Sequence, residues 1–237
     1  MTHIQPMEPA DAYVQLGQIK LGETDLHGVF QKIADLAKRT IPGASEVSVT
    51  LVENQDAYTP AFTGELALAL DEAQYKLGHG PCLAAAASTS TQHIADMTSE
   101  SRWPDWTARA SEAGAHSSLS IGLPVQEAVT GALNIYATEA DAFGEDALAV
   151  AHTFASYAEV AMANAYLYNA QTTLAQHMEI AMRSRAVIEQ AKGIIMGDRR
   201  CSADEAFAIL TKLSQDTNRK LRDVAVALVG RATTPKP

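Results

Sequence analysis

Residues 131–136 read Gly-Ala-Leu-Asn-Ile-Tyr and carry a firm strand pattern. Leu133 and Ile135 fall on one face, because successive side chains of a strand point to opposite sides. Far upstream, residues 46–52 read Glu-Val-Ser-Val-Thr-Leu-Val, which alternates polar and apolar positions and is rich in β-branched residues. Both stretches therefore predict half-buried strands.

Further strands are expected on either side of these two. The turn residues 54–56 separate 46–52 from a return strand over 57–63, and shorter patterns predict strands at 92–94 and 117–124. Four to six short strands with helices before, between and after them are typical of an α+β sandwich, and they argue against a doubly wound parallel sheet.

Helical spacing predicts the elements that surround the strands. Thr24 or Asp25 is a good N-cap for a helix that stops near Thr40, and further helices are expected over 65–77 and 103–113. Residues 1–22 show no sustained period, so we expect them to form a loosely attached lead-in that could include a short helix.

A long helix is predicted from residue 145 to 196, where no Pro occurs and Gly first appears at 193. One apolar row repeats every seven residues along it: Val160, Leu167, Leu174, Ala181 and Ile188. Such a row fits a two-helix seam between protomers, and it fits equally a helix packed on its own domain.

Three short amphipathic helices are predicted at the C-terminal end. Gly197 is expected to end the first, and Ser202 with Glu205 forms a capping box that starts the second. Asn218 is expected to cap the third. None of these helices can bury its apolar stripe alone, so we expect them to form a small bundle.

The charge is divided unevenly along the 237 residues, although the formal net charge is only -10. Residues 183–237 hold 11 Lys/Arg and 6 Asp/Glu, a net of +5, whereas residues 1–182 carry a net of -15. A basic C-terminal segment attracts polyanions, which the acidic remainder repels. Two isolated cysteines, no secretory signal and no long apolar run predict a soluble cytoplasmic protein.

No catalytic or metal-binding motif stands out. The spacings of His79, Cys82, His93 and His116 match no metal-ligand motif, and no nucleophile elbow or phosphate-binding loop occurs, so we expect no enzyme and no metal. One aromatic and polar set is expected either to line a small-molecule pocket over the sheet or to fill the core: Gln74, Tyr75, Trp103, Trp106 and Tyr136.

Residues 190–196, Gln-Ala-Lys-Gly-Ile-Ile-Met, and 221–225, Leu-Arg-Asp-Val-Ala, closely resemble an ANTAR domain. The resemblance implies a three-helix RNA-binding module of transcription antiterminators, whose members bind paired stem-loops in nascent RNA. Carried over to this chain, the RNA-facing basic positions are Arg185, Lys192, Arg219, Lys220 and Arg222.

The preceding region resembles a GAF domain, a fold with an antiparallel sheet flanked by helices. The segments that carry this resemblance are 74–75, 80–83, 102–104, 123–124 and 131–136, with Phe143 after them. It implies a sensing or dimerising domain, and it identifies the fold better than the ligand. From the aromatic and polar set above, the residues expected to contact a ligand are Gln74, Tyr75, Trp103 and Tyr136. No cysteine pair is placed for a haem or a bilin, and the cofactor stays unidentified.

The resulting organisation is a lead-in over 1–22, a GAF-like sensor over 23–165, a helical linker over 166–183 and an RNA-binding bundle over 184–232. The chain is expected to act as a homodimeric, signal-responsive antitermination regulator with RNA stem-loops as partners and no membrane contact. The alternative is a ligand-binding or dimerisation protein whose helical tail binds DNA or a protein partner.

Overall fold

The computed structural model describes residues 6–233 and divides the chain into two compact units, residues 1–169 and residues 170–237. We call them unit 1 and unit 2. Helix α6 (Glu145–Arg199) contributes to both units and is helical along its whole length of 55 residues.

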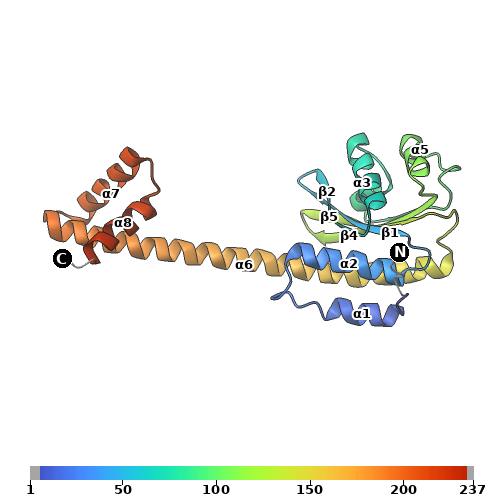
Figure 1. Cartoon of the computed structure of the whole chain (residues 1–237), viewed down its shortest axis with the longest axis horizontal. Coiled ribbons are helices and arrows are strands. Elements are labelled where there is room, and N and C mark those ends of the chain that lie inside the picture. Colours follow the sequence, from blue (N-terminus) through green and yellow to red (C-terminus); the bar gives the residue numbers. More distant parts are fainter. Residues whose placement is uncertain (1–5, 234–237) are drawn as a thin grey trace. The chain divides into compact units, whose positions relative to one another are not determined.

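Unit 1 is built on one five-stranded antiparallel sheet in the order β2-β1-β5-β4-β3 (Figure 1). Its strands are β1 (Glu46–Glu53), β2 (Asp56–Phe62), β3 (Thr91–Ile94), β4 (Ser117–Gln126) and β5 (Val129–Ala137). The two long patterns read from the sequence pair directly, with Leu133 opposite Val49 in the β1–β5 ladder. The predicted α+β fold with an antiparallel sheet is confirmed.

The first face of the sheet is apolar and packs against helices. Val47, Val49, Leu133 and Ile135 lie in one buried cluster with residues of α2 (Leu26–Thr40) and of the first part of α6. Asp25 caps α2 by accepting a hydrogen bond from the backbone N–H of Gly28 at 2.8 Å, as its sequence position predicted.

The opposite face of the sheet is polar yet buried. It carries Ser48, Thr50, Ser118, Ser120 and Asn134, each fully buried beneath the helices on that side. Those helices are α3 (Glu65–Leu77), α4 (Pro81–Ser88) and α5 (Pro104–Glu112). The contrast between the two faces means that unit 1 contains a polar interior in addition to a hydrophobic one.

A glycine lets α4 approach this polar face closely. A Cβ built on Gly122 of β4 would collide with the carbonyl oxygen of Ala85 and would lie 2.7 Å from the Cα of Thr89. Only a residue without a side chain fits there, because both obstacles are backbone atoms.

The expectation of a loosely attached lead-in is wrong for part of residues 1–22. Helix α1 (Pro9–Gly17) buries Ala12 and Leu16 in the same cluster as α2 and α6, and the N–H of Met7 donates to Arg39 O at 2.9 Å. These two apolar side chains were too few to reveal a helical period in the sequence.

Unit 2 contains the end of α6, α7 (Ala203–Thr217) and α8 (Leu221–Thr233). Its core consists of Ala191, Ile195, Ala206, Leu210, Val224 and Ala225. The capping box of Ser202 and Glu205 is present as predicted.

Two expected helix ends in unit 2 are wrong. Helix α6 continues through Gly197 to Arg199, because an interior glycine costs only about 1 kcal/mol and Ile195 is anchored in the core. Asn218 is the C-cap of α7, not the N-cap of α8: it adopts a left-handed conformation with φ 50°. Asn tolerates that conformation better than most residues do.

Candidate functional site

The basic residues predicted to face RNA lie on the surface of unit 2, outside its small core. Arg185, Arg219, Lys220 and Arg222 are exposed. The last three surround the first turn of α8, where the carbonyl oxygen of Lys220 accepts hydrogen bonds from the N–H groups of Asp223 and Val224. Cations and a helix N-terminus thus lie together, which favours binding of an anion such as phosphate.

The partners of this basic group bind it weakly. The guanidinium of Arg222 lies 3.4 Å from the carboxylate of Asp223, and Arg219 reaches the carbonyl oxygen of Asp223 at the same distance. Exposed ion pairs of this kind are worth about 0–1 kcal/mol. A phosphate can therefore replace them at little cost.

Lys192 differs from the other predicted positions. Its side chain is only 17% exposed, and its ammonium group is paired with the carboxylate of Glu189 at 3.0 Å. This lysine offers less free charge to a ligand than its type and position in the sequence indicated.

Three of the four residues predicted to contact a small molecule meet inside unit 1. The hydroxyl of Tyr136 donates to Asp71 at 2.6 Å, and the hydroxyl of Tyr75 lies 2.9 Å from that of Thr50. Gln74 accepts a hydrogen bond from the N–H of Cys82 at 2.8 Å, which ties α3 to the start of α4.

Asp71 is the centre of this arrangement, and sequence reasoning missed it. Its carboxylate is fully buried and accepts hydrogen bonds from Tyr136, from Asn134 at 3.3 Å and from Thr59 at 2.9 Å. Burial raises the pKa of Asp71 to about 6, although these hydrogen bonds oppose the shift. We call the set Thr50, Thr59, Asp71, Gln74, Tyr75, Asn134 and Tyr136 the polar network.

The aromatic and polar set had already included Gln74, Tyr75 and Tyr136, and a further sequence signal for the network was the alternation in β5. Asn134 and Tyr136 occupy the positions between Leu133 and Ile135, so they must share the other face of the strand. The Oδ1 atom of Asn134 and the hydroxyls of Ser118 and Ser120 on that face have no protein hydrogen-bond partner. Buried polar atoms normally have one, so this face is suited to a polar guest.

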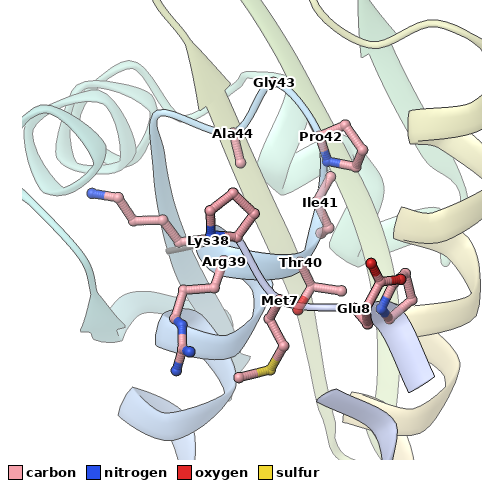
Figure 2. Close-up of a pocket in the computed structure, with 11 residues that line it drawn as sticks. Met7, Glu8, Lys38, Arg39, Thr40, Ile41, Pro42, Gly43 and Ala44 are labelled. Carbon is pink, nitrogen blue, oxygen red and sulfur yellow. The ribbon is translucent and has the colours of Figure 1, made fainter. Parts of the chain in front are cut away.

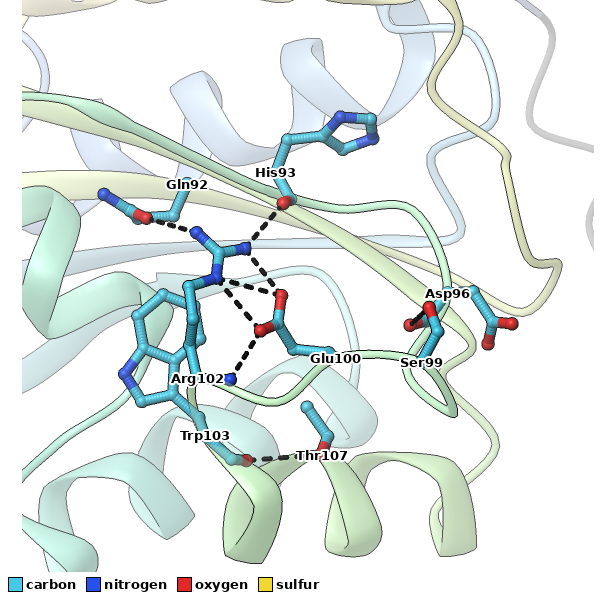
Figure 3. Close-up of polar contacts among 8 residues, drawn as sticks. All are labelled: Gln92, His93, Asp96, Ser99, Glu100, Arg102, Trp103 and Thr107. Carbon is cyan, nitrogen blue, oxygen red and sulfur yellow. Dashed lines mark hydrogen bonds and ion pairs between the residues drawn. The ribbon is translucent and has the colours of Figure 1, made fainter.

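The fourth predicted ligand residue, Trp103, lies at the edge of a buried apolar cluster that contains Leu70 and Trp106. The guanidinium carbon of Arg102 lies 4.5 Å from the centre of the Trp103 ring. Figure 3 shows that Arg102 is also bound by Glu100, by Gln92 at 3.0 Å and by the backbone of His93 at 2.9 Å. Arg102 lowers the pKa of Glu100 through this hydrogen-bonded pair. Trp106, by contrast, is a core residue whose ring N–H donates to Leu70 O at 3.0 Å.

A cleft of about 490 Å³ lies between the start of the described chain and the end of α2 (Figure 2). It is lined by residues 6–9 and 38–44, and the side chain of Thr40 is buried there without a hydrogen-bond partner for its hydroxyl. This cleft could not be predicted from the sequence, because its two walls are about 30 positions apart.

The described residues were also considered for metal ligands, reactive thiols and membrane-spanning helices. Within residues 6–233, no group of three or more His, Cys, Asp and Glu side chains is arranged to hold a metal ion. Cys82 and Cys201 are free thiols, and burial raises the pKa of the Cys82 thiol. In the same part of the chain, no helix combines the length and apolar character needed to cross a bilayer.

Comparison with family models gives two matches. A model described as GAF domain matches residues 23–163, and one described as ANTAR domain matches residues 176–229. No curated protein matches the chain.

Solved structures resemble the fold of unit 1. The phycocyanobilin-bound GAF domain from a cyanobacterial phytochrome superposes with a TM-score of 0.53 at 12% identity, covering 68% of this chain and 97% of its own. The reduced form of fRMsr of Staphylococcus aureus gives 0.52 at 19% identity, covering 68% and 99%. The GAF domain from a phosphoenolpyruvate-protein phosphotransferase of Coxiella burnetii gives 0.51 at 19%, covering 69% and 98%. At these identities the likeness establishes the fold alone.

Proposed function

The chain belongs to the GAF-domain family and carries an ANTAR domain after it, and on this premise we propose that it is a signal-responsive transcription antitermination regulator that binds RNA stem-loops. GAF domains sense signals, and ANTAR domains are RNA-binding antiterminator domains. The proposal needs no catalytic step in this chain. Nascent RNA as the partner places its action in the cytoplasm.

The observation that carries the proposal is the exposed basic group of Arg219, Lys220 and Arg222 at the start of α8, inside the ANTAR match. RNA binding through phosphates releases counterions, so affinity falls steeply with salt. The acidic remainder of the chain, with its net charge of -15, does not compete for the same polyanion.

The test is a gel shift with paired RNA stem-loops at two salt concentrations. Lys220→Ala and Arg222→Ala should each weaken binding by about tenfold and lower the salt slope by about one. Lys212→Ala is the matched control: it removes the same charge from an exposed position of the same unit, on α7. Equal, small effects of all three substitutions would remove the α8 group from the RNA site.

Duplex DNA serves as the competing ligand in the same assay. Three-helix bundles also enter the DNA major groove, so a basic bundle by itself does not select RNA. Displacement of hairpin RNA by an equal concentration of duplex DNA would contradict the proposal. Indifference to both nucleic acids would leave a dimerisation or protein-binding role for unit 2.

For unit 1 we propose a small polar ligand over the buried polar face of the sheet, contacting Gln74, Tyr75 and Tyr136, with Trp103 at the edge. The polar network and the unpartnered atoms of Ser118, Ser120 and Asn134 support an uncharged guest with both donors and acceptors. A metabolite screen that follows tryptophan emission tests this, because both tryptophans, Trp103 and Trp106, lie in unit 1.

We further propose that the protein acts as a homodimer through α6. Val160, Leu167 and Leu174 of the seven-residue row are 59%, 54% and 58% exposed, so large apolar side chains on this helix face solvent. A second copy of the same helix would cover them, because in a parallel pair of helices the apolar row of one copy packs against the same row of the other. Two RNA-binding bundles on one dimer would then gain affinity for paired stem-loops through effective concentration.

Mass measurement in solution tests the dimer. Leu167→Glu or Leu174→Glu should convert it to a monomer, because each places a charge in the seam. Ile180→Glu is the control: Ile180 is 51% exposed on the same helix but lies outside the row. A wild-type protein of monomer mass at micromolar concentration would sink the dimer and leave RNA binding to be judged by itself.

A further inference from the structure

Unit 2 carries two surface grooves that differ in charge. The larger, of about 490 Å³, lies between α6 and α7 and has charges of both signs at its rim, from Asp198, Arg199, Lys212 and Asp216. The smaller, of about 180 Å³, lies between α7 and α8, and we call it the α7/α8 groove. Its lining residues are Leu213, Thr217, Arg219, Val224, Ala227, Leu228 and Arg231. Of these two grooves among the described residues, the α7/α8 groove is the one with a purely positive rim.

The α7/α8 groove combines an apolar floor with two planar cations. Val224 is buried and Leu228 half-buried, so the floor offers little hydrogen bonding. Arg219 lies in the turn just before α8 and Arg231 in the last turn of that helix, and both are exposed. A guanidinium can stack on the flat face of an unpaired base and still attract the neighbouring phosphate, which an ammonium cannot do.

The groove's size limits its occupant. Sites that enclose a drug-sized molecule measure roughly 300–1,000 Å³, so 180 Å³ suits a single flat ring rather than a whole nucleotide. The hydroxyl of Thr217 lies at the groove and already donates to Leu213 O at 2.6 Å, which leaves its oxygen as an acceptor for a base N–H.

We propose that the α7/α8 groove receives one unpaired base from the loop of the bound RNA, held between the apolar floor and the guanidiniums of Arg219 and Arg231. This inference rests on the RNA binding proposed above, and it specifies which part of the RNA the protein recognises. Phosphate contacts at the start of α8 position the stem, whereas the groove distinguishes loops by the base they extrude.

The experiment uses the full-length protein and a hairpin RNA selected from a library with a constant stem and a randomised loop. Each loop nucleotide is then replaced in turn by an abasic residue. One position should lower affinity by about tenfold, in line with the loss of one stacked base. Ala227→Phe fills the groove and should cost a similar factor on the intact RNA, while removing the sensitivity to that abasic position.

The controls separate this inference from the proposed function. Val226→Phe adds the same ring at an exposed neighbouring position outside the groove and should keep full affinity and full abasic sensitivity. Arg219→Lys and Arg231→Lys retain charge, so they should keep the salt slope and lose part of the sensitivity to the abasic position.

Three outcomes overturn the inference. If the RNA binds but no abasic position lowers its affinity, the groove does not hold a base, and the proposed RNA binding still stands. Ala227→Phe that retains abasic sensitivity but loses dimer mass assigns the groove to a second copy of the chain. Failure of the wild-type protein to select any hairpin sinks both this inference and the proposed function.

Discussion

Unit 1 holds its polar groups beneath its surface, whereas unit 2 holds them on its surface. Unit 1 buries the carboxylate of Asp71, the hydroxyl of Tyr136 and the amide of Asn134 inside the fold, whereas unit 2 keeps most of its cations exposed around a core of six residues. Under the proposed function, a ligand at the polar network would have to disturb packing. RNA at unit 2 would only have to exchange exposed ion pairs, so we expect the first event to cost more free energy than the second.

The largest expected effect tests how deeply unit 1 is packed. Trp106→Ala should destabilise unit 1 by about 3–5 kcal/mol, because a fully buried indole leaves a cavity and the carbonyl of Leu70 loses its donor. Denaturant unfolding followed by the emission of Trp103 measures it. Trp103→Ala, at the partly exposed edge of the same cluster, should cost under about 1 kcal/mol. Similar losses for the two substitutions would contradict the packing described for unit 1.

The next effect concerns the small core of unit 2. Leu210→Ala should cost about 3 kcal/mol, which approaches the whole stability that such a small core supplies. RNA binding should fall with it, while tryptophan emission stays unchanged because both tryptophans lie in unit 1. Ile209→Ala removes a similar volume from an exposed position and should leave RNA binding intact. If Leu210→Ala also changed the tryptophan emission, the two units would not unfold separately.

The elements that local rules govern were predictable from the sequence. Alternation gave β1 and β5, and the Ser202–Glu205 spacing gave the start of α7. Asp71 was not predictable, because a carboxylate on an amphipathic helix ordinarily faces solvent and only tertiary packing buries this one. Asn218 was assigned to the wrong helix for a different reason: Asn serves both as an N-cap and as a left-handed C-cap.

The buried carboxylate should reverse the usual effect of acid on unit 1. Because the pKa of Asp71 is raised from 3.8 to about 6, the folded protein holds a proton between these values that the unfolded chain has released. The contribution of Asp71 to stability therefore rises as pH falls from 7 to 4, by up to about 3 kcal/mol. The measured quantity is the difference in unfolding free energy between wild type and Asp71→Asn, from pH 8 to pH 4.5.

A neighbouring carboxylate provides the control for this titration. Glu72 follows Asp71 on α3 but is exposed and paired with Lys76 at 3.1 Å. Glu72→Gln should leave the pH dependence nearly unchanged, whereas the difference for Asp71→Asn should shift in favour of wild type as pH falls. A flat difference for Asp71→Asn would mean that the network holds its carboxylate at an ordinary pKa, and Asp71 would then stay ionised over this whole pH range, stabilised by its hydrogen bonds.

The smallest expected effect concerns the exposed cap at the start of α7 in unit 2. Ser202→Ala removes the N-cap of α7, whose hydroxyl accepts from the N–H of Glu205 at 3.3 Å, and should cost about 1 kcal/mol. The backbone N–H of Ser202, and to a lesser extent its hydroxyl, lowers the pKa of Glu205, so this stabilisation is present near neutral pH and is lost as pH falls through that lowered value. Ser184→Ala is the control, because Ser184 bonds the carbonyl of Ile180 within α6 and its replacement should be neutral or slightly stabilising. Thermal unfolding of both variants at pH 7 and pH 4 checks the prediction. Acid should thus weaken the cap of unit 2 only below about pH 4.5, the ordinary pKa of a glutamate, whereas Asp71 gains its stability for unit 1 mainly between pH 7 and 4. A Ser202→Ala effect that stays constant with pH would show that the Ser202 hydroxyl does not contribute to the lowered pKa of Glu205.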